Sequence, residues 1–168
     1  VRLIDAHWEE ESEEALAATI ERFKNSLGLE ADGSNTAKAV VTGRVKVPSV
    51  SAELYDDIYA NFPNLIVDDG NINYIMKYVD YDGNVLYTDL LHEGGDAIDP
   101  VATGKIEAPV RPTTDDCIYE YAGWNMLPTN VEKHYVIVAQ YDTQYAAKFY
   151  NDTELLYTQW VSSGESAS

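Results

Sequence analysis

Two stretches of this chain repeat the same residue pattern, one near its middle and one at its end. The first, YIMKYVDYDGNVLYTDLLHEGG, begins at Tyr74, and the second, YAAKFYNDTELLYTQWVSSGE, begins at Tyr145. Tandem repetition is typical of modular arrays. The pattern predicts one module of about 70 residues, followed by the opening hairpin of a second copy. The matched pairs, 71 residues apart before a one-residue deletion and 70 after it, are Tyr74 with Tyr145, Lys77 with Lys148, Tyr78 with Phe149, Asp82 with Asp152, Leu86 with Leu156, Tyr87 with Tyr157, Thr88 with Thr158, and Gly94 with Gly164.

From Asn73 onward the sequence predicts strands. NYIMKYV and VLYTDLL are rich in β-branched and aromatic residues and flank the turn sequence DYDGN. CIYEYAGWNM and HYVIVAQYDT predict two more strands, and most of the 13 tyrosines lie in this half of the chain. The segment APVRPTTDD, directly before CIYEYAGWNM, is predicted to be irregular because proline cannot sit in a central strand.

The first part of the chain predicts helices. Residues 8–27 carry one apolar stripe, with acidic residues at the start and Arg22 and Lys24 near the end, which suits the helix dipole. Residues 39–72 predict a strand–helix–strand unit, in which Ser51 caps the helix and Phe62-Pro63 ends it. The apolar positions of the two helices are Leu16, Ile20, Phe23 and Leu27, and then Leu54, Ile58 and Phe62.

These patterns predict an α+β fold with four segments. Residues 1–38 form an acidic helix and a linker, and residues 39–72 form the strand–helix–strand unit. Residues 73–143 form the β module, and residues 144–168 begin a second, truncated copy. We expect the native polypeptide to continue, because a module of two strands lacks half of its sheet.

The acidic loop between the first two strands of the module has two interpretations. Asp80, Asp82 and Asn84 provide oxygen atoms of the kind that bind calcium. However, a helix–loop–helix calcium site needs a glutamate at its twelfth position, which is Leu91 here, and the copy at residues 151–154 lacks the glycine. A hairpin turn needs only Asp, Gly and Asn. The sequence therefore favours a turn, with a weak surface cation site as the alternative.

Charge restricts the partners. Lysine and arginine number 11 and aspartate and glutamate number 29, so the formal net charge is −18. A nucleic acid or an anionic membrane would be repelled, and we expect neither as a partner. The single cysteine, Cys117, allows no disulfide within the chain and no cysteine zinc site.

No set of residues in the sequence predicts catalysis or a cofactor. His7, His92 and His134 lack the local spacing of metal ligands. The pairs Asp68-Asp69 and Asp115-Asp116 are adjacent residues beside turns, which favours capping and solvation. Cys117 has no activating neighbour in the sequence, and Trp124 and Trp160 are expected to pack in the cores of the two copies. We therefore predict no enzyme.

The β module resembles the internalin-type B-repeat, also called the Listeria–Bacteroides repeat. That resemblance implies a small β-grasp-like fold with a four-stranded sheet. Such repeats occur in phage virion proteins and bacterial surface proteins, usually as spacers or adhesion modules. The positions that carry the resemblance are Asp82-Gly83, Gly94-Gly95, Pro100, Pro109, Arg111-Pro112, Tyr119, Tyr121, Gly123-Trp124, Ala139 and Tyr141.

Residues 40–67, with FPNLIV, resemble a degenerate leucine-rich-repeat unit. Together the two resemblances imply a structural or adhesion module of a larger phage virion protein, located in the virion. The alternative is a bacterial cell-surface adhesin that binds a host protein or glycan. The expected partners are other structural subunits or a host surface receptor, and self-association into a homo-oligomer stays open.

Overall fold

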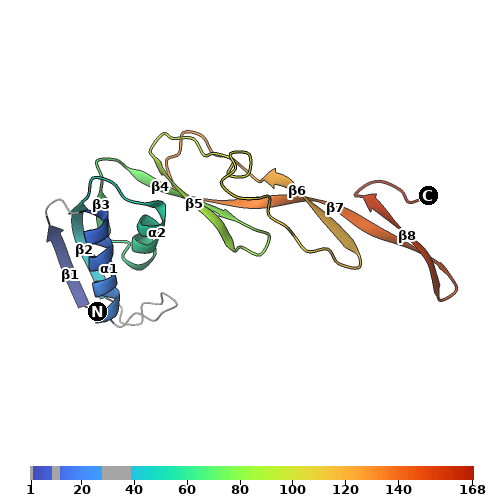
Figure 1. Cartoon of the computed structure of the whole chain (residues 1–168), viewed down its shortest axis with the longest axis horizontal. Helices are drawn as coiled ribbons and strands as arrows, with labels where there is room; N and C mark the ends of the chain where they lie inside the picture. The colour runs from blue at the N-terminus through green and yellow to red at the C-terminus, as the bar shows by residue number, and fades with distance from the viewer. Residues whose placement is uncertain (1, 9–11, 28–38) are drawn as a thin grey trace. The chain divides into compact units, whose positions relative to one another are not determined.

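The computed structural model describes residues 2–8, 12–27 and 39–168 (Figure 1). Within these residues the chain forms two helices and eight strands, so the predicted mixed α+β class is confirmed. The chain divides into two compact units. The first takes in Val1–Met76, Thr88–Asp96 and Thr129–Tyr135, and the second takes in Lys77–Tyr87, Ala97–Pro128 and Val136–Ser168. Among the described residues, neither helix has the length and apolar character needed to cross a membrane.

The first unit contains a parallel sheet of three strands in chain order. These are β1 (Arg2–Trp8), β2 (Ala39–Lys46) and β3 (Leu65–Asp68), with β2 in the middle. Helix α1 (Glu13–Leu27) lies between β1 and β2 in the chain, and α2 (Ala52–Asn61) lies between β2 and β3. Parallel neighbours need such crossover connections, because a tight turn can join only antiparallel strands.

The prediction of a helix over residues 8–27 was wrong at its start. The helix begins at Glu13, and residue 8 is the last residue of strand β1. Ser12 sets the beginning, because its Oγ accepts a hydrogen bond from the Ala15 backbone N–H at 3.1 Å, as an N-cap does. The sequence did not predict strand β1, because the glutamates after it are typical of a helix start and placed the predicted helix too early in the chain.

Helix α2 agrees with the prediction at both ends. The Ser51 side chain accepts a hydrogen bond from the Leu54 N–H, and the chain leaves the helix at Phe62, directly before Pro63. The Ser51 N–H donates to Glu13 Oε1 at 2.8 Å, which links the starts of the two helices. Hydrogen bonds from Ser51 hold the pKa of Glu13 below its ordinary value.

Both helices pack on one face of the parallel sheet. Leu16 and Ile20 of α1 and Ile58 of α2 are fully buried against the inward side chains of β2 and β3. Alternate residues of β2 and β3 point the other way, and on that face Arg44, Lys46 and Ile66 are exposed. The strands therefore have one covered face and one open face. The core cluster consists of Leu16, Ile20, Val41, Val45, Val47, Ile58, Phe62, Leu65 and Val67.

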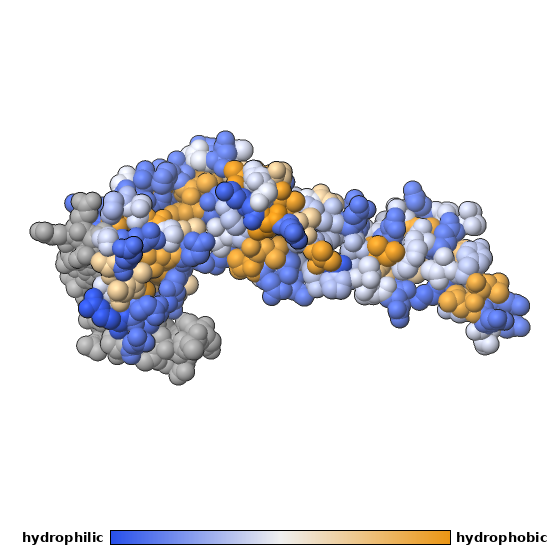
Figure 2. Space-filling model, in the orientation of Figure 1, coloured by the Kyte–Doolittle hydropathy of each residue, from blue (hydrophilic) through white to orange (hydrophobic). Residues whose placement is uncertain are grey.

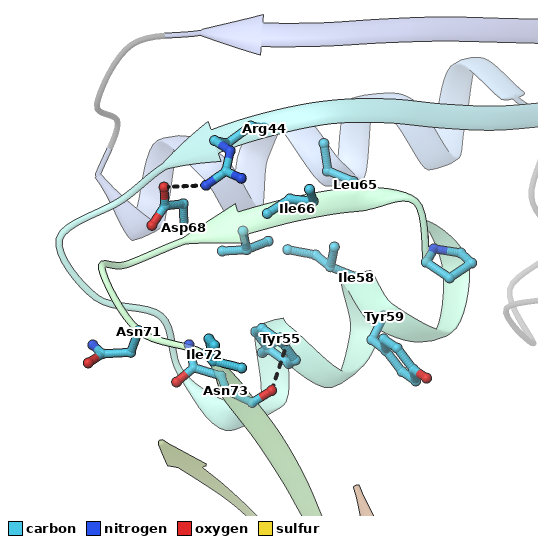
Figure 3. Close-up of a pocket in the computed structure, with 12 residues that line it drawn as sticks. Arg44, Tyr55, Ile58, Tyr59, Leu65, Ile66, Asp68, Asn71, Ile72 and Asn73 are labelled. Carbon is cyan, nitrogen blue, oxygen red and sulfur yellow. Dashed lines mark hydrogen bonds and ion pairs between the residues drawn. The ribbon is translucent and has the colours of Figure 1, made fainter. Parts of the chain in front are cut away.

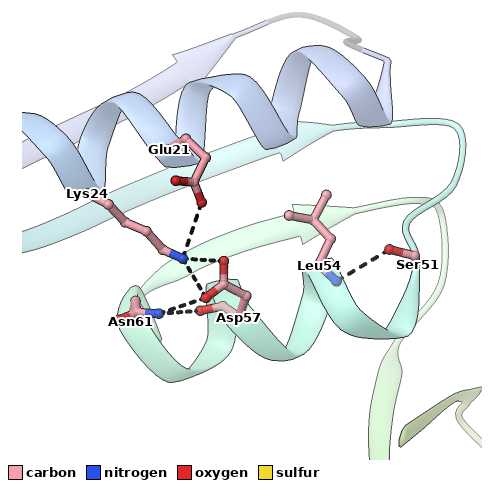
Figure 4. Close-up of polar contacts among 6 residues, drawn as sticks. All are labelled: Glu21, Lys24, Ser51, Leu54, Asp57 and Asn61. Carbon is pink, nitrogen blue, oxygen red and sulfur yellow. Dashed lines mark hydrogen bonds and ion pairs between the residues drawn. The ribbon is translucent and has the colours of Figure 1, made fainter. Parts of the chain in front are cut away.

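A polar contact joins the helices across this core (Figure 4). Lys24 Nζ donates to Asp57 Oδ1 at 2.6 Å and lies 3.5 Å from Glu21 Oε1. Asn61 Nδ2 donates to the same Asp57 oxygen at 3.0 Å. The Lys24 side chain is only 21% exposed, so this ion pair is better shielded from water than an ordinary surface pair.

The remaining strands form a five-stranded sheet. These are β4 (Asn73–Val79), β5 (Val85–His92), β6 (Cys117–Trp124), β7 (Tyr135–Asn151) and β8 (Glu154–Ser162). The order is β5-β4-β7-β6, and β8 also pairs with β7. Four of these strands were predicted by β-branched and aromatic runs, and β8 was predicted by the sequence repeat.

Strand β7 is longer than predicted, because it runs without interruption through the expected module boundary at residue 143. Its residues 139–145 pair with β6, and its residues 144–151 pair with β8, both antiparallel. No glycine or proline interrupts β7 around Thr143, so nothing in the sequence stops the strand there. A bulge shifts the β6 register between Tyr121 and Gly123, and Gly123 has a positive φ of 108°.

An aromatic cluster forms the core of the second unit. Tyr78 is fully buried, with the Trp124 ring edge-on at 5.1 Å and the Tyr87 ring at 5.7 Å. The Tyr78 hydroxyl donates to the Ile98 carbonyl, and Trp124 Nε1 donates to Asp99 Oδ1 at 3.1 Å. Trp124 is thus held as a half-buried core residue.

Two other tyrosines of this cluster bury hydroxyl groups without a partner. The hydroxyl oxygens of Tyr121 and Tyr141 are buried, and neither has a hydrogen-bond partner among the described residues. Burial raises the pKa of Tyr121 to about 12, with Asp99 and Tyr141 adding to the effect. An unpaired buried hydroxyl lowers the stability of the fold, because it loses its hydrogen bonds to water without replacement.

A matched pair of tyrosine substitutions tests this account. Tyr78→Phe removes the partner of the Ile98 carbonyl and should lower the free energy of unfolding by about 1–3 kcal/mol. Tyr141→Phe removes an unpaired hydroxyl and should leave the stability unchanged or raised. Urea unfolding of both variants measures the difference. A larger loss for Tyr141→Phe than for Tyr78→Phe would contradict the assignment of these hydroxyls.

Candidate functional site

The first unit carries a groove along β3 (Figure 3). The cavity has a volume of about 330 Å³ and lies between β3, helix α2 and residues 71–73. Its floor is apolar and buried, formed by Ile58 of α2 and by Leu65 and Val67 of β3. Its rim is apolar and exposed, because Tyr59, Ile66 and Ile72 are 46%, 49% and 58% accessible to water. Exposed apolar side chains around a cavity are typical of a binding surface.

Charged and amide side chains close one end of the groove. Arg44 Nη1 donates to Asp68 Oδ2 at 2.8 Å, and Asp68 Oδ1 accepts from the Gly70 N–H at 3.0 Å. The hydrogen bond from Arg44 is the main cause that holds the pKa of Asp68 below its ordinary value. Asp68 was predicted to be a turn and capping residue, and its bond to Gly70 is of that kind. The charges of Arg44 and Asp68 neutralise each other, so the Arg44 guanidinium is not available to bind an anion at this end of the groove.

Asn73 fixes the wall of the groove opposite β3. Its side chain is buried, with Oδ1 lying 2.6 Å from His92 Nδ1, and Nδ2 donating to Asp69 Oδ1 at 3.0 Å. Its carbonyl oxygen accepts a hydrogen bond from the Tyr55 hydroxyl at 3.3 Å. A buried amide with both ends paired is held in one orientation, so the first residue of β4 has a defined position beside α2.

His134 is a second anchor at the start of β4. Its Nδ1 accepts a hydrogen bond from the Ile75 backbone N–H at 2.8 Å, so this nitrogen carries no proton. The ring of Tyr59 lies 4.5 Å from the imidazole, and the ring of Tyr74 lies 5.6 Å from it. Burial lowers the pKa of His134, while Asp56 acts in the opposite direction. Both histidines thus have packing and hydrogen-bonding roles, and His7 lies among residues whose side chains are not described.

The predicted turn or cation loop lies at the tip of the β4–β5 hairpin. Asp80 Oδ1 accepts from the backbone N–H groups of Asp82 and Asn84, and Asn84 Nδ2 donates to Asp80 Oδ2 at 2.9 Å. The bond from the Asn84 side chain is the first cause that lowers the pKa of Asp80. Gly83 has a positive φ of 85°, as the residue after a tight turn requires. The Asp80 carboxylate and the Asn84 amide are therefore occupied within the turn, and Asp82 contributes its backbone N–H.

The other residues considered from the sequence do not converge. Asp116 forms a surface ion pair with Lys148 at 2.6 Å, directly before the start of β6. Cys117 is a free thiol that is partly buried. In the part of the chain that the structure describes, no three His, Cys, Asp or Glu side chains come together closely enough to hold a metal ion.

A second surface lies on the β7–β8 hairpin, where apolar atoms are exposed (Figure 2). Leu155, Leu156 and Tyr157 are 48%, 57% and 49% accessible to water, and Trp160 is 37% accessible. The prediction that Trp160 packs in a core does not hold within the described residues. The rings of Phe149 and Tyr157 stack at 4.4 Å, but water still reaches this face of the hairpin.

This hairpin matches the β4–β5 hairpin in its local geometry. The N–H of Gly95 donates to the His92 carbonyl at 2.9 Å, and 70 residues later that of Glu165 donates to the Ser162 carbonyl at 3.1 Å. Gly94 and Gly164 occupy the third position of these turns, with φ values of 82° and 86°. The ring pair of Phe149 and Tyr157 stands where the first hairpin has the ring pair of Tyr78 and Tyr87.

Comparison with known proteins adds no assignment: no family model, no curated protein and no solved structure matches this chain. Sequence reasoning missed the groove. Ile66 stood inside an apolar run that predicted a strand, and nothing in the run indicated that its side chain faces water. The NIN triplet at residues 71–73 gave the only signal, since it places a large apolar residue between two amides.

The position of His134 predicts a pH dependence of stability. The fold lowers its pKa, so the unfolded chain takes up the proton more readily, and the free energy of unfolding should fall as the pH drops below about 6.5. His134→Asn removes the titrating group and should flatten this slope. Urea midpoints of both proteins at about pH 7.5, 6.5 and 5.5 measure the slope of stability against pH. These pH values lie above the range in which carboxylates titrate. Equal slopes for the two proteins would contradict the prediction.

Proposed function

We propose that this chain is a non-enzymatic structural or adhesion module of a larger phage virion protein, of the tail, baseplate or head-fibre type. It acts as a spacer or in attachment to the host surface. In this proposal β4 to β7 form a β-grasp-like B-repeat module, the β7–β8 hairpin opens a second copy, and residues 39–72, with β2, α2 and β3, form a leucine-rich-like unit.

The observation that carries the proposal is the agreement between the two hairpins. The turns that follow β5 and β8, the positive-φ glycines in those turns, and the positions of the aromatic pairs coincide at the spacing of the sequence repeat. Two hairpins of unrelated origin would share the alternation of side chains between the two faces. They would not be expected to share a turn of the same kind after the second strand, at the same distance from an aromatic ring pair. Tandem copies of one small module are a common way to build extended arrays.

The join between the proposed copies supports a spacer. Strand β7 continues from Tyr135 to Asn151, and it is hydrogen-bonded first to β6 and then to β8. A paired strand at the join resists bending more than a flexible linker does. The net charge of −18 keeps neighbouring copies apart in solution and disfavours collapse of the array.

A bacterial cell-surface adhesin that binds a host protein or glycan is the second candidate. The exposed apolar rim of the groove and the exposed aromatic face of β8 favour attachment over a pure spacer in either candidate, because attachment needs such surfaces. The two candidates share the same module and differ in the particle that carries it.

Exchange of the hairpin turns tests the proposed repeat. Residues 151–154 of the second turn are replaced by the sequence of residues 80–84 from the first. If the hairpins are copies, the longer turn should fit, and stability should change by less than about 0.5 kcal/mol in urea unfolding. A control places the same five residues in reverse order. The repeat is rejected if the exchanged protein loses stability in urea unfolding and does not differ from the control.

Immunogold labelling tests the location. Antibodies raised against the chain are applied to purified phage particles and to the host cells in electron microscopy. We expect label on the particles, at the tail or at the head fibres. Label confined to the cell envelope would reject the virion and support the surface adhesin.

A further inference from the structure

The outer edge of β3 has unused backbone hydrogen-bonding groups. The Val47 N–H donates to the Asp68 carbonyl at 3.0 Å, so Asp68 and Ile66 direct their backbone groups toward β2. Leu65 and Val67 therefore direct theirs to the opposite edge, where Leu65 N–H already donates to Phe62. The N–H and carbonyl of Val67 have no partner among the described residues, because β3 pairs only with β2.

The groove lies along this same edge. A side chain that enters it would contact Ile58, Leu65 and Val67 on the floor, and the exposed Ile66 and Ile72 on the rim. At about 330 Å³ the cavity is near the small end of ligand pockets, which span about 300–1,000 Å³. It suits one or two apolar side chains better than a cofactor.

The charge of the chain favours a basic partner. Near the groove, Arg44 and Lys46 both act on the Asp68 carboxylate, and the second carboxylate, Asp69, accepts hydrogen bonds from the Asn71 N–H and the Asn73 amide. These local charges balance, and the preference for a basic partner rests on the formal net charge of −18 of the whole chain. An acidic segment would be repelled, and a lysine or arginine beside Asp69 would be attracted.

We propose that the free edge of β3 and its apolar groove bind an extended peptide segment of another protein, in which apolar and basic side chains alternate. The segment adds as a strand to β3. Its backbone bonds with Val67, one apolar side chain fills the groove between Ile58 and Ile72, and a basic side chain lies near Asp69. Strand addition of this kind gives affinity through backbone bonds and specificity through alternate side chains. This inference does not depend on the proposed module copies or on the particle that carries them.

A glycan fits the groove less well. Sugar binding needs an open aromatic face and free planar polar groups. Here one face of Tyr59 lies against His134, the Tyr55 hydroxyl is bonded to Asn73, and Arg44 and Asp68 are bonded to each other.

The test is amide NMR of the full chain titrated with a terminally blocked octapeptide of alternating valine and lysine. We expect the Val67 amide signal to shift and its hydrogen exchange to slow. The double variant Ile66→Ser/Ile72→Ser, which changes only exposed side chains, should bind about tenfold more weakly. Val110→Ser is the matched control, because Val110 is 83% exposed in the second unit, and it should bind as the unchanged protein does.

Two further peptides and one sugar complete the design. The same peptide with prolines in place of its central valines cannot add as a strand, and a valine–glutamate peptide reverses the charge. Both should bind more weakly. An unperturbed Val67 amide at millimolar valine–lysine peptide overturns the proposal, as does equal protection by the proline peptide. Chitotriose that perturbs the groove while no peptide does so also overturns it, in favour of a glycan site.

Discussion

The hydrogen bonds of the buried Asn73 decide where the chain goes after its parallel sheet. Its amide joins Asp69 to His92, and its carbonyl oxygen receives the Tyr55 hydroxyl, so the end of the loop, helix α2 and the end of β5 all meet at one residue. Each of these bonds is partly buried, and an unpaired amide at this position would cost about 1–3 kcal/mol for each lost partner. Two residues later the Ile75 N–H donates to His134 Nδ1, which fixes the third residue of β4.

The groove is a consequence of this anchor. Because Asn73 is held beside Tyr55, residues 71–73 turn away from β3 and do not form a fourth parallel strand next to it. Strand β3 is therefore left as an edge, and the side chains of Ile66 and Ile72 stay exposed on the two sides of the cavity. Edge strands are commonly protected by short length and charge. Here β3 has only four residues and ends at Asp68, which limits pairing to partners that tolerate or favour acidic neighbours.

Local patterns predicted most elements of the fold, and the failures have local causes. Ser51 and Phe62-Pro63 bound α2 because capping and proline geometry act within a few residues. Ser12 does the same for α1, yet the glutamates before it imitate a helix start, and strand β1 was missed as a result. The groove was not predictable, because it depends on the pairing of Asn73 with Asp69, Tyr55 and His92, and no periodicity reports contacts between residues far apart in the chain.

The two hairpins show what repetition in sequence does and does not transfer. Turn geometry is local, so Gly94 and Gly164 have the same conformation although their surroundings differ. Burial is not local. Tyr78 is fully buried beside Trp124, whereas its counterpart Phe149 is half-buried. Leu156 and Tyr157 of β8 are exposed where Leu86 and Tyr87 of β5 are half-buried. A residue pattern determines its local backbone conformation, but its packing depends on the segments that cover it. For this reason Trp160 could be placed on its strand from the sequence, while its exposure could be learned only from the structure.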